Sequence, residues 1–209
     1  MGKTLVIGAS GKIGRILLSK YTESIISPVA MVRDQRKQGF SKSVEVVEAD
    51  LEQDIDSVMN GCSTVVFTAG SGAGSGLDKT LLVDLWGARK AIDASKKAGI
   101  DHFIMVSSRG ADNPDYGPLA IKPYLVAKHF ADEYLIQSGL NYTILRPGRL
   151  IDDEGSGLIN TIRPQNPEKQ VISRDDTAKV IVHCLHNKKV SNKIYELYKG
   201  QDSVELAIT

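Results

Sequence analysis

The sequence of 209 residues has no long apolar run, and none of its apolar segments approaches the roughly 18 residues that a bilayer-spanning helix needs. It also lacks the basic and then apolar order of a secretory signal peptide, because a strand-like segment begins at Lys3. We therefore expect a cytoplasmic protein with no membrane partner. The formal net charge is only +1, so no overall field would draw the protein to nucleic acid.

Cysteine is scarce as well, and Cys62 and Cys184 lie too far apart for the spacing of a metal site. Cys62 opens an apolar strand-like run and Cys184 lies in an apolar helical run, which indicates buried thiols that act as small hydrophobic side chains. His183 and His186 share a helix face at i and i+3, but no third ligand accompanies them. We therefore expect no metal.

Short apolar runs alternate with amphipathic helical patterns over the first two thirds of the chain. The runs are residues 4–7, 29–32, 44–47, 64–67, 103–106 and 142–145. Several are apolar at every position, which is typical of strands covered on both faces. The two longer helical stripes consist of Leu81, Leu82, Leu85, Ala88, Ala91, Ile92 and Ala98, and of Leu125, Phe130, Tyr134 and Leu135. This order predicts an α/β fold with a Rossmann-type doubly wound parallel sheet.

The pattern changes after Pro147. Residues 148–170 are rich in Gly, Pro, Asp and Asn and lack periodicity, which predicts a loop. A helix is expected at 175–186 and a last strand at 194–198. Because this tail is too small to fold alone, we expect a single domain over 1–209, with 147–209 forming a small cap beside a substrate cleft.

The strongest local motif follows the first predicted strand and opens a helix: Gly8-Ala9-Ser10-Gly11-Lys12-Ile13-Gly14. The first glycine permits a tight turn, the second lets the backbone approach a pyrophosphate, and the third lets the helix pack on the strand. The helix N-terminus then offers free N–H groups and a positive dipole end to phosphates. The motif therefore predicts a dinucleotide site.

The end of the second predicted strand bears on the choice between NAD and NADP. Arg33 stands there and can accommodate a 2′-phosphate or stack on adenine, whereas an acidic residue would bind the ribose hydroxyl. Arg36 and Lys37 follow closely and add positive charge. These residues favour NADP, while Asp34 keeps NAD open, and a solvated basic loop is the alternative without function.

Two later strand ends also fit a cofactor cleft. Asp50 and Leu51 follow the third run, where the carboxylate can accept a hydrogen bond from adenine and the leucine can pack on its ring. Small residues after the fourth run would let the backbone pass beside a ribose; they are Thr68, Ala69 and Gly70. The glycine- and serine-rich segment 69–76 is either a flexible connector or a mobile flap beside the cofactor.

Catalytic candidates follow the fifth run. Ser107 and Ser108 come directly after it, and Tyr124 and Lys128 lie at i and i+4 of the next helical pattern. Such a pair shares one helix face, and a nearby ammonium lowers the pKa of a phenol from its ordinary value of about 10. A tyrosine of this kind can exchange a proton with a substrate carbonyl or hydroxyl, while a serine holds the same oxygen.

With these motifs the chain resembles the short-chain dehydrogenase/reductase superfamily, above all its small atypical members described as NAD(P)-binding, sugar-epimerase-like or NmrA-like. The resemblance extends from Lys3 to about Gly148 and resumes at 172–176. It implies that Lys128 also binds the nicotinamide ribose, within a catalytic triad of Ser108, Tyr124 and Lys128. Motifs and resemblance together predict a cofactor site made of Gly8, Ser10, Gly11, Lys12, Ile13, Gly14, Arg33, Asp50, Leu51, Thr68, Ala69, Gly70, Ser107, Lys128, Pro147 and Gly148.

Two departures from the family pattern narrow what the resemblance implies. Extended members often have an asparagine before a Val-x-Gly-Thr sequence in the long helix, where this chain has Asp84 followed by residues 85–88. The tail after Pro147 is shorter than in nucleotide-sugar epimerases, which argues against that substrate. Tyr116 competes with Tyr124 for the catalytic role, but prolines place it in a loop and no lysine accompanies it.

The sequence therefore predicts an NADP-dependent oxidoreductase or epimerase-like enzyme that moves a hydride to or from a small carbonyl or hydroxyl substrate. The alternatives are an NAD(P)-binding redox sensor without turnover and a reductase of flavins or tetrapyrroles. Arg174 is either a substrate contact or part of a helix start capped by Ser173. The apolar faces of the helices around Trp86 and after Tyr124 either pair in a homodimer, as in many relatives, or are buried in the core.

Overall fold

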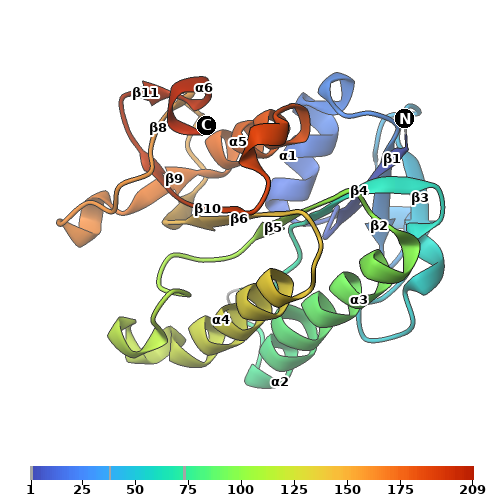
Figure 1. Cartoon of the computed structure of the whole chain (residues 1–209), viewed down its shortest axis with the longest axis horizontal. Coiled ribbons are helices and arrows are strands. Elements are labelled where there is room, and N and C mark those ends of the chain that lie inside the picture. Colours follow the sequence, from blue (N-terminus) through green and yellow to red (C-terminus); the bar gives the residue numbers. More distant parts are fainter. Residues whose placement is uncertain (1, 38, 73) are drawn as a thin grey trace.

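The computed structural model describes residues 2–37, 39–72 and 74–209, and its centre is one large sheet (Figure 1). The strands of this sheet are β1 (Lys3–Ile7), β2 (Pro28–Val32), β3 (Glu45–Glu48), β4 (Cys62–Phe67), β5 (His102–Val106), β6 (Tyr142–Pro147), β8 (Leu158–Asn160), β10 (Lys193–Lys199) and β11 (Asp202–Ser203). Their order is β11-β8-β10-β6-β5-β4-β1-β2-β3. Strands β1 to β6 and β10 run parallel, whereas β8 is antiparallel to β10 and β11. The order on both sides of β1 confirms the Rossmann-type sheet.

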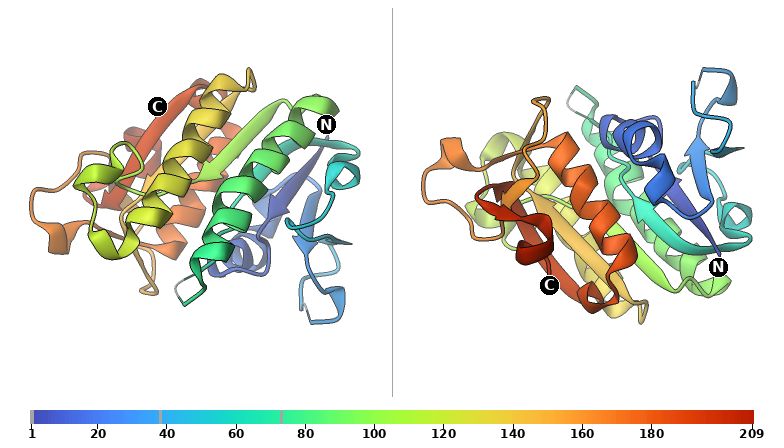
Figure 2. Two further views of the ribbon diagram at one scale, coloured as in Figure 1. Left: turned by 90° about the horizontal axis from the view of Figure 1, so that it is seen from below. Right: turned by 90° about the horizontal axis from the view of Figure 1, so that it is seen from above.

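Helices cover both faces of the sheet. They are α1 (Lys12–Lys20), α2 (Leu77–Lys79), a π-helical segment η4 (Thr80–Gly87), α3 (Ala88–Ala98), α4 (Lys122–Gln137), α5 (Arg174–His186) and α6 (Val204–Ala207). Short 3₁₀ turns are η1 (Thr22–Ser24), η2 (Gln35–Lys37), η3 (Asp56–Met59), η5 (Pro114–Tyr116), η6 (Leu119–Ile121), η7 (Pro167–Lys169) and η8 (Lys188–Val190). Figure 2 shows α3 and α4 side by side on one face, and α1 with α5 on the other.

The strands are apolar at successive positions because each face of the sheet buries its own set of side chains. In β1, Leu5 and Ile7 pack toward α3 and α4, while Val6 between them packs toward α1 and α5. Phe67 of β4 and Phe103 of β5 stack within the first of these two clusters. The prediction of strands covered on both faces is therefore confirmed.

The prediction of a loop over 148–170 is wrong at two places. Gly148 is followed by β7 (Arg149–Ile151), which pairs in parallel with β9 (Val171–Ser173), and β8 adds to the edge of the main sheet. These strands are too short for periodicity to reveal, and pairing with distant residues is what orders them. The tail is also divided: β10 pairs with β6 and α5 packs on α1, so both belong to the main fold. Within 149–173, β7 and β9 form a separate two-stranded sheet, whereas β8 belongs to the main sheet.

The two apolar helical stripes predicted from the sequence are not buried at every position. Leu81 is 57% exposed, and Leu82 and Phe130 are exposed as well. Leu81 and Leu82 lie in η4, whose i→i+5 hydrogen bonds turn the chain more slowly than 3.6 residues per turn. Residues spaced at the α-helical period of 3.6 therefore do not stay on one face of η4. This is why Leu81 and Leu82 point away from the core although they belong to the predicted stripe.

The two cysteines differ in how deeply they are buried. Cys184 is buried, and burial raises the pKa of its thiol to about 12, as expected for an inert side chain. Cys62 is half-buried, and burial raises the pKa of its thiol as well. No helix within the described residues is long and apolar enough to cross a membrane.

Candidate functional site

The glycine-rich turn between β1 and α1 has the geometry that the motif predicts. Gly8 has φ 86°, and a Cβ there would lie 2.5 Å from the backbone nitrogen of Ala69. The Gly11 N–H donates to the Gly8 carbonyl at 2.9 Å, which closes the turn. A Cβ at Gly14 would lie 2.5 Å from the same carbonyl oxygen, so the helix packs on the turn only with glycine there.

The first turn of α1 is open to a phosphate. Gly11 is its N-cap, no side chain caps it, and no acidic residue lies in the first turn. The backbone N–H groups of this turn are therefore left for an anion, and the helix dipole favours one there. Ile13 is buried in the core, while Lys12 is exposed and its Nζ lies 2.6 Å from Asp152 Oδ2.

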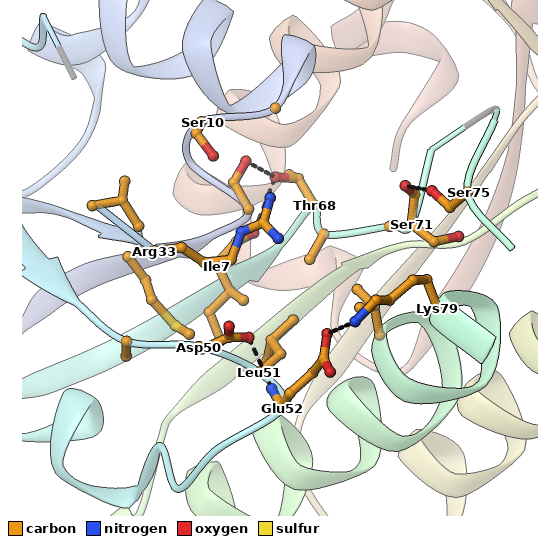
Figure 3. A pocket seen from close by; sticks show the side chains of 18 residues that line it. Ile7, Ser10, Arg33, Asp50, Leu51, Glu52, Thr68, Ser71, Ser75 and Lys79 are labelled. Carbon is orange, nitrogen blue, oxygen red and sulfur yellow. Dashed lines mark hydrogen bonds and ion pairs between the residues drawn. The ribbon is translucent and has the colours of Figure 1, made fainter. Parts of the chain in front are cut away.

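A cavity of about 430 Å³ opens beside this turn at the carboxyl ends of the strands (Figure 3). Nine residues predicted to bind the cofactor line it: Gly8, Ser10, Gly11, Arg33, Asp50, Leu51, Thr68, Ala69 and Gly70. They come from loops after four strands that neighbour one another in the sheet. The convergence of these loops is what places the predicted residues in one site.

The loop after β2 separates two opposite charges. Arg33 lines the cavity, whereas the carboxylate of Asp34 accepts hydrogen bonds from the backbone N–H of Arg36 at 3.0 Å and from its Nε at 3.1 Å. The basic side chain therefore lies at the cavity, and the neighbouring acid is engaged by the next arginine. The side chain of Lys37, which was expected to add charge here, lies outside the described residues.

Sequence reasoning missed part of the cavity wall. Glu52 and Lys79 both line it, and their side chains form an ion pair of 2.5 Å between the loop after β3 and α2. Figure 3 shows Lys79, Ser71 and Ser75 on the side of the cavity that faces Arg33. Glu52 stands two residues after Asp50, but nothing in the sequence indicates that Lys79 reaches it. Only the folded chain brings α2 to this loop.

The segment 69–76 begins at the cavity wall and leads into α2. Residue 73 of this segment lies outside the described residues, and the mobile flap stays a prediction. Ser75 Oγ donates to the carbonyl oxygens of Ser71 and Gly72, which folds the described part of the segment on itself. The cavity is thus bordered by a short serine and glycine loop.

The catalytic candidates meet at the carboxyl end of β5. Lys128 is buried, and its Nζ lies 3.3 Å from the carbonyl oxygen of Val106, directly before the two serines. The same Nζ lies 5.8 Å from the ring centroid of Tyr124, one helical turn earlier in α4. The Ser108 hydroxyl donates to the carbonyl oxygen of Arg109 at 3.1 Å. The structure thus brings tyrosine, lysine and the strand end together.

Lys128 also has a partner that sequence reasoning did not assign. Its Nζ lies 3.2 Å from Asp84 Oδ1, and the two side chains are 3% and 0% exposed. Burial opposes the charge on Lys128, but interactions with Tyr124, Asp84 and Asp132 outweigh it and hold the lysine pKa above its ordinary value. Asp84 is the residue at which the chain departs from the asparagine of extended members, and that departure was the available signal.

Three other predicted residues lie beside this end of the sheet rather than at the cavity. Ser107 is buried, and the Arg109 N–H donates to the Pro147 carbonyl at 3.0 Å, which joins the ends of β5 and β6. A Cβ at Gly148 would lie 2.5 Å from the Gln170 carbonyl oxygen, so close packing of the β7 and β9 segment also accounts for this glycine.

The helix start at Ser173 has a structural explanation. The Ser173 hydroxyl accepts a hydrogen bond from the Asp176 N–H at 2.9 Å, as an N-cap does. Arg174 pairs with Asp152 at 2.6 Å, the same carboxylate that binds Lys12. Among the described residues, no group of three His, Cys, Asp or Glu side chains is placed to hold a metal.

Comparison with known proteins points to one family. Residues 8–188 match the model of a family described as NAD(P)H-binding. The protein YhfK of Bacillus subtilis (strain 168), named an uncharacterized sugar epimerase, is 42% identical over 99% of this chain and 98% of its own length. The match therefore includes the glycine turn, the cavity and the catalytic candidates.

Solved structures agree in fold. A Bacillus halodurans protein, described as a candidate NAD-dependent epimerase/dehydratase, has a TM-score of 0.91 at 40% identity and covers 100% of this chain and 99% of its own. ChuY of Escherichia coli O157:H7, an anaerobilin reductase, has a TM-score of 0.74 at 28% identity, with 93% of this chain and 96% of its own covered. Epimerases and reductases thus stand among the proteins that this chain is similar to.

Proposed function

Because the chain belongs to the NAD(P)H-binding family, we propose that it is an NADP-dependent oxidoreductase of the short-chain dehydrogenase/reductase type. The observation that carries the proposal is the buried Lys128 ammonium beside Tyr124 at the end of β5. A cavity of about 430 Å³ begins at the neighbouring strand, and its glycine turn leaves a cradle that a Cβ would fill. The proposed cofactor site and the proposed proton donor, Tyr124, therefore lie at the same edge of the sheet.

The residues divide the work as follows. When bound, NADPH supplies a hydride. Tyr124 donates a proton to the substrate oxygen, Lys128 stabilises the phenolate that results and binds the nicotinamide ribose, and Ser108 orients the substrate oxygen. In the reverse direction, oxidation of a substrate hydroxyl, the Tyr124 phenolate accepts the hydroxyl proton. An epimerase of this type uses the same proton transfer.

The preference for NADP rests on Arg33. Its guanidinium lines the cavity while Asp34 is engaged by Arg36, which favours a 2′-phosphate over a free ribose hydroxyl. A second candidate function is the reduction of planar tetrapyrroles or flavins, favoured by the likeness to ChuY. That reaction would depend less on Tyr124 than reduction of a carbonyl does.

The test starts with cofactor binding. NADPH and NADH are titrated by fluorescence against the wild type and Arg33→Ala. We expect Arg33→Ala to weaken NADPH binding by about tenfold to a hundredfold, as loss of a charge-assisted hydrogen bond does, and to leave NADH nearly unchanged. Equal affinity of the wild type for both cofactors would contradict the role of Arg33.

Turnover is then measured with the preferred cofactor on aldehydes, ketones, quinones, flavins and biliverdin. Tyr124→Phe should lower kcat on a carbonyl substrate by about 10²- to 10⁴-fold, without a change in cofactor affinity. Tyr116→Phe is the matched control, because Tyr116 is 88% exposed. Full turnover by Tyr124→Phe on a flavin or biliverdin would favour the second candidate, and binding without turnover of any substrate would favour a redox sensor.

A further inference from the structure

The Asp84 carboxylate joins two parts of the candidate site. One oxygen, Oδ1, lies 3.2 Å from Lys128 Nζ, and the other, Oδ2, accepts a hydrogen bond from the Ser71 N–H at 3.0 Å. Ser71 lines the cofactor cavity, and Lys128 lies at the end of β5. One buried carboxylate therefore connects the cavity wall with the lysine of the catalytic pair.

The position of Asp84 is set by an unusual piece of helix. It lies within the π-helical segment η4, and π-turns inside helices are frequent at functional sites. A Cβ at Gly70 would come within 3.1 Å of Asp84 Oδ1, so the loop after β4 lies directly against the carboxylate. The loop, the π-helical turn and α4 thus meet at this one side chain.

Two carboxylates act on the Lys128 ammonium. Asp84 of η4 lies on one side, and Asp132 of α4, one turn beyond Lys128, contributes from the other. Asp132 in turn binds Arg146 of β6, whose Nε lies 2.9 Å from Oδ2. Within the described residues, the groups whose charges act on Lys128 are thus Tyr124, Asp84 and Asp132, and burial raises the pKa of Asp132 itself above its ordinary value.

An ammonium group held in such a place needs its counterion. A single buried charge is costly, and a lysine without a partner loses its proton or destabilises the fold. The electrostatic interactions with Tyr124, Asp84 and Asp132 outweigh burial and hold the Lys128 pKa above its ordinary value. Within the described residues, Asp84 is the carboxylate that forms an ion pair with Lys128 Nζ.

We propose that Asp84 is a positioning residue, which keeps the Lys128 ammonium charged and fixes it to the cofactor cavity wall through Ser71. This inference rests on the proposed function, in which Lys128 binds the nicotinamide ribose. Asp84 itself touches neither cofactor nor substrate. It acts by holding the lysine in one place and in one charge state.

The first experiment measures NADPH affinity between pH 7 and pH 9.5 for the wild type, Asp84→Asn and Asp93→Asn. Asp84→Asn keeps the size of the side chain and an oxygen for the Ser71 N–H, but removes the charge. Wild-type affinity should change little over this range, whereas Asp84→Asn should lose about tenfold or more as Lys128 gives up its proton. Asp93→Asn, in α3 and half-exposed, should behave like the wild type.

The second experiment needs no cofactor. Thermal unfolding is compared for Asp84→Asn, Lys128→Met and the double variant. Asp84→Asn alone leaves a buried charge without its counterion, so it should lower Tm more than the double variant does. If Asp84→Asn does not fold, the double variant should still fold, and failure of both would overturn the proposal.

The outcomes separate this inference from the proposed function. If the wild type binds neither NADPH nor NADH, the proposed function fails, while the Tm comparison still decides whether Asp84 and Lys128 act as a pair. If the wild type binds NADPH and the affinity of Asp84→Asn follows the wild type at every pH, the positioning role is wrong and the proposed function stands. Additive Tm changes in the two single variants would also overturn it.

Discussion

Gly8 combines a left-handed backbone with a crowded environment. Its φ is 86°, and a Cβ would lie 2.5 Å from the backbone nitrogen of Ala69. Gly8→Ala therefore costs about 1–2 kcal/mol for the backbone conformation, and the clash with the backbone after β4 adds to it. We expect a clear loss of stability in urea and loss of NADPH binding, because the turn that faces the phosphates is displaced.

Gly61→Ala is the matched control for this prediction. Gly61 has a similar φ of 73°, but nothing lies within 4 Å of the place that its Cβ would take. It should show the backbone cost alone and bind NADPH as the wild type does. Equal loss of stability in the two variants would mean that the close approach to Ala69 is unimportant.

At the scale of elements, α1 and α5 are tied together by Asp175. Its Oδ2 lies 2.5 Å from Lys20 Nζ, and its Oδ1 accepts a hydrogen bond from the Tyr21 hydroxyl at 3.0 Å. The Gly155 N–H donates to it as well, at 3.1 Å. One carboxylate at the start of α5 therefore fixes the end of α1 and the loop before β8.

This contact predicts an acid-sensitive stability. Burial raises the pKa of Asp175, but the hydrogen bonds from Lys20, Tyr21 and Gly155 outweigh it, so the folded pKa lies below the ordinary 3.8. A carboxyl of this kind stabilises the fold above its unfolded pKa, and the contribution is lost as the pH falls through the folded pKa. Asp175→Asn should therefore remove part of the loss of stability seen in urea between pH 5 and about pH 2.

The control for this prediction is Asp153→Asn in the exposed loop before Gly155. It should keep the pH dependence of the wild type, because the Asp153 carboxylate is exposed and forms no hydrogen bond or ion pair within the described residues. An unchanged acid dependence in Asp175→Asn would show that the contact between α1 and α5 does not depend on this carboxylate.

At the scale of the whole molecule, η4 and α4 carry exposed aromatic side chains. Trp86 is 48% exposed, and the Arg89 guanidinium lies 4.8 Å from its ring centroid and 5.1 Å from that of Tyr134. Phe130, one turn before Tyr134, is exposed too. Arg89 of α3 thus lies between an aromatic side chain of η4 and one of α4, on the face opposite α1 and α5 (Figure 2).

We predict that a second copy of the chain covers this surface. Light scattering after gel filtration should give about twice the chain mass of 22.7 kDa for the wild type, and Trp86→Glu should shift it to the single chain. Leu206→Glu is the control, since Leu206 is 74% exposed in α6, on the other side of the sheet. A wild type that elutes as a single chain at tens of micromolar would contradict the dimer.

The sequence by itself determined the order of the elements and the nucleotide end of the site. Apolar runs and glycine stops fixed the strands β1 to β6 within a few residues, because burial on both faces leaves a local signature. The Gly8 to Gly14 motif determined the turn before α1, since backbone strain and close packing act within a few residues. Arg33, Asp50 and Thr68 followed from their places at strand ends.

The tertiary structure decided what depends on contacts between distant segments. Lys79 reaches Glu52, and Asp84 reaches Lys128 and Ser71, through pairings with no local pattern. Strands β7 and β9 form by pairing with each other, and β8 forms by pairing with β10 and β11. The π-helical turn that exposes Leu81 breaks the 3.6-residue period. Sequence periodicity reports burial along one element, whereas the connection between the cavity and Lys128 arises where several elements meet.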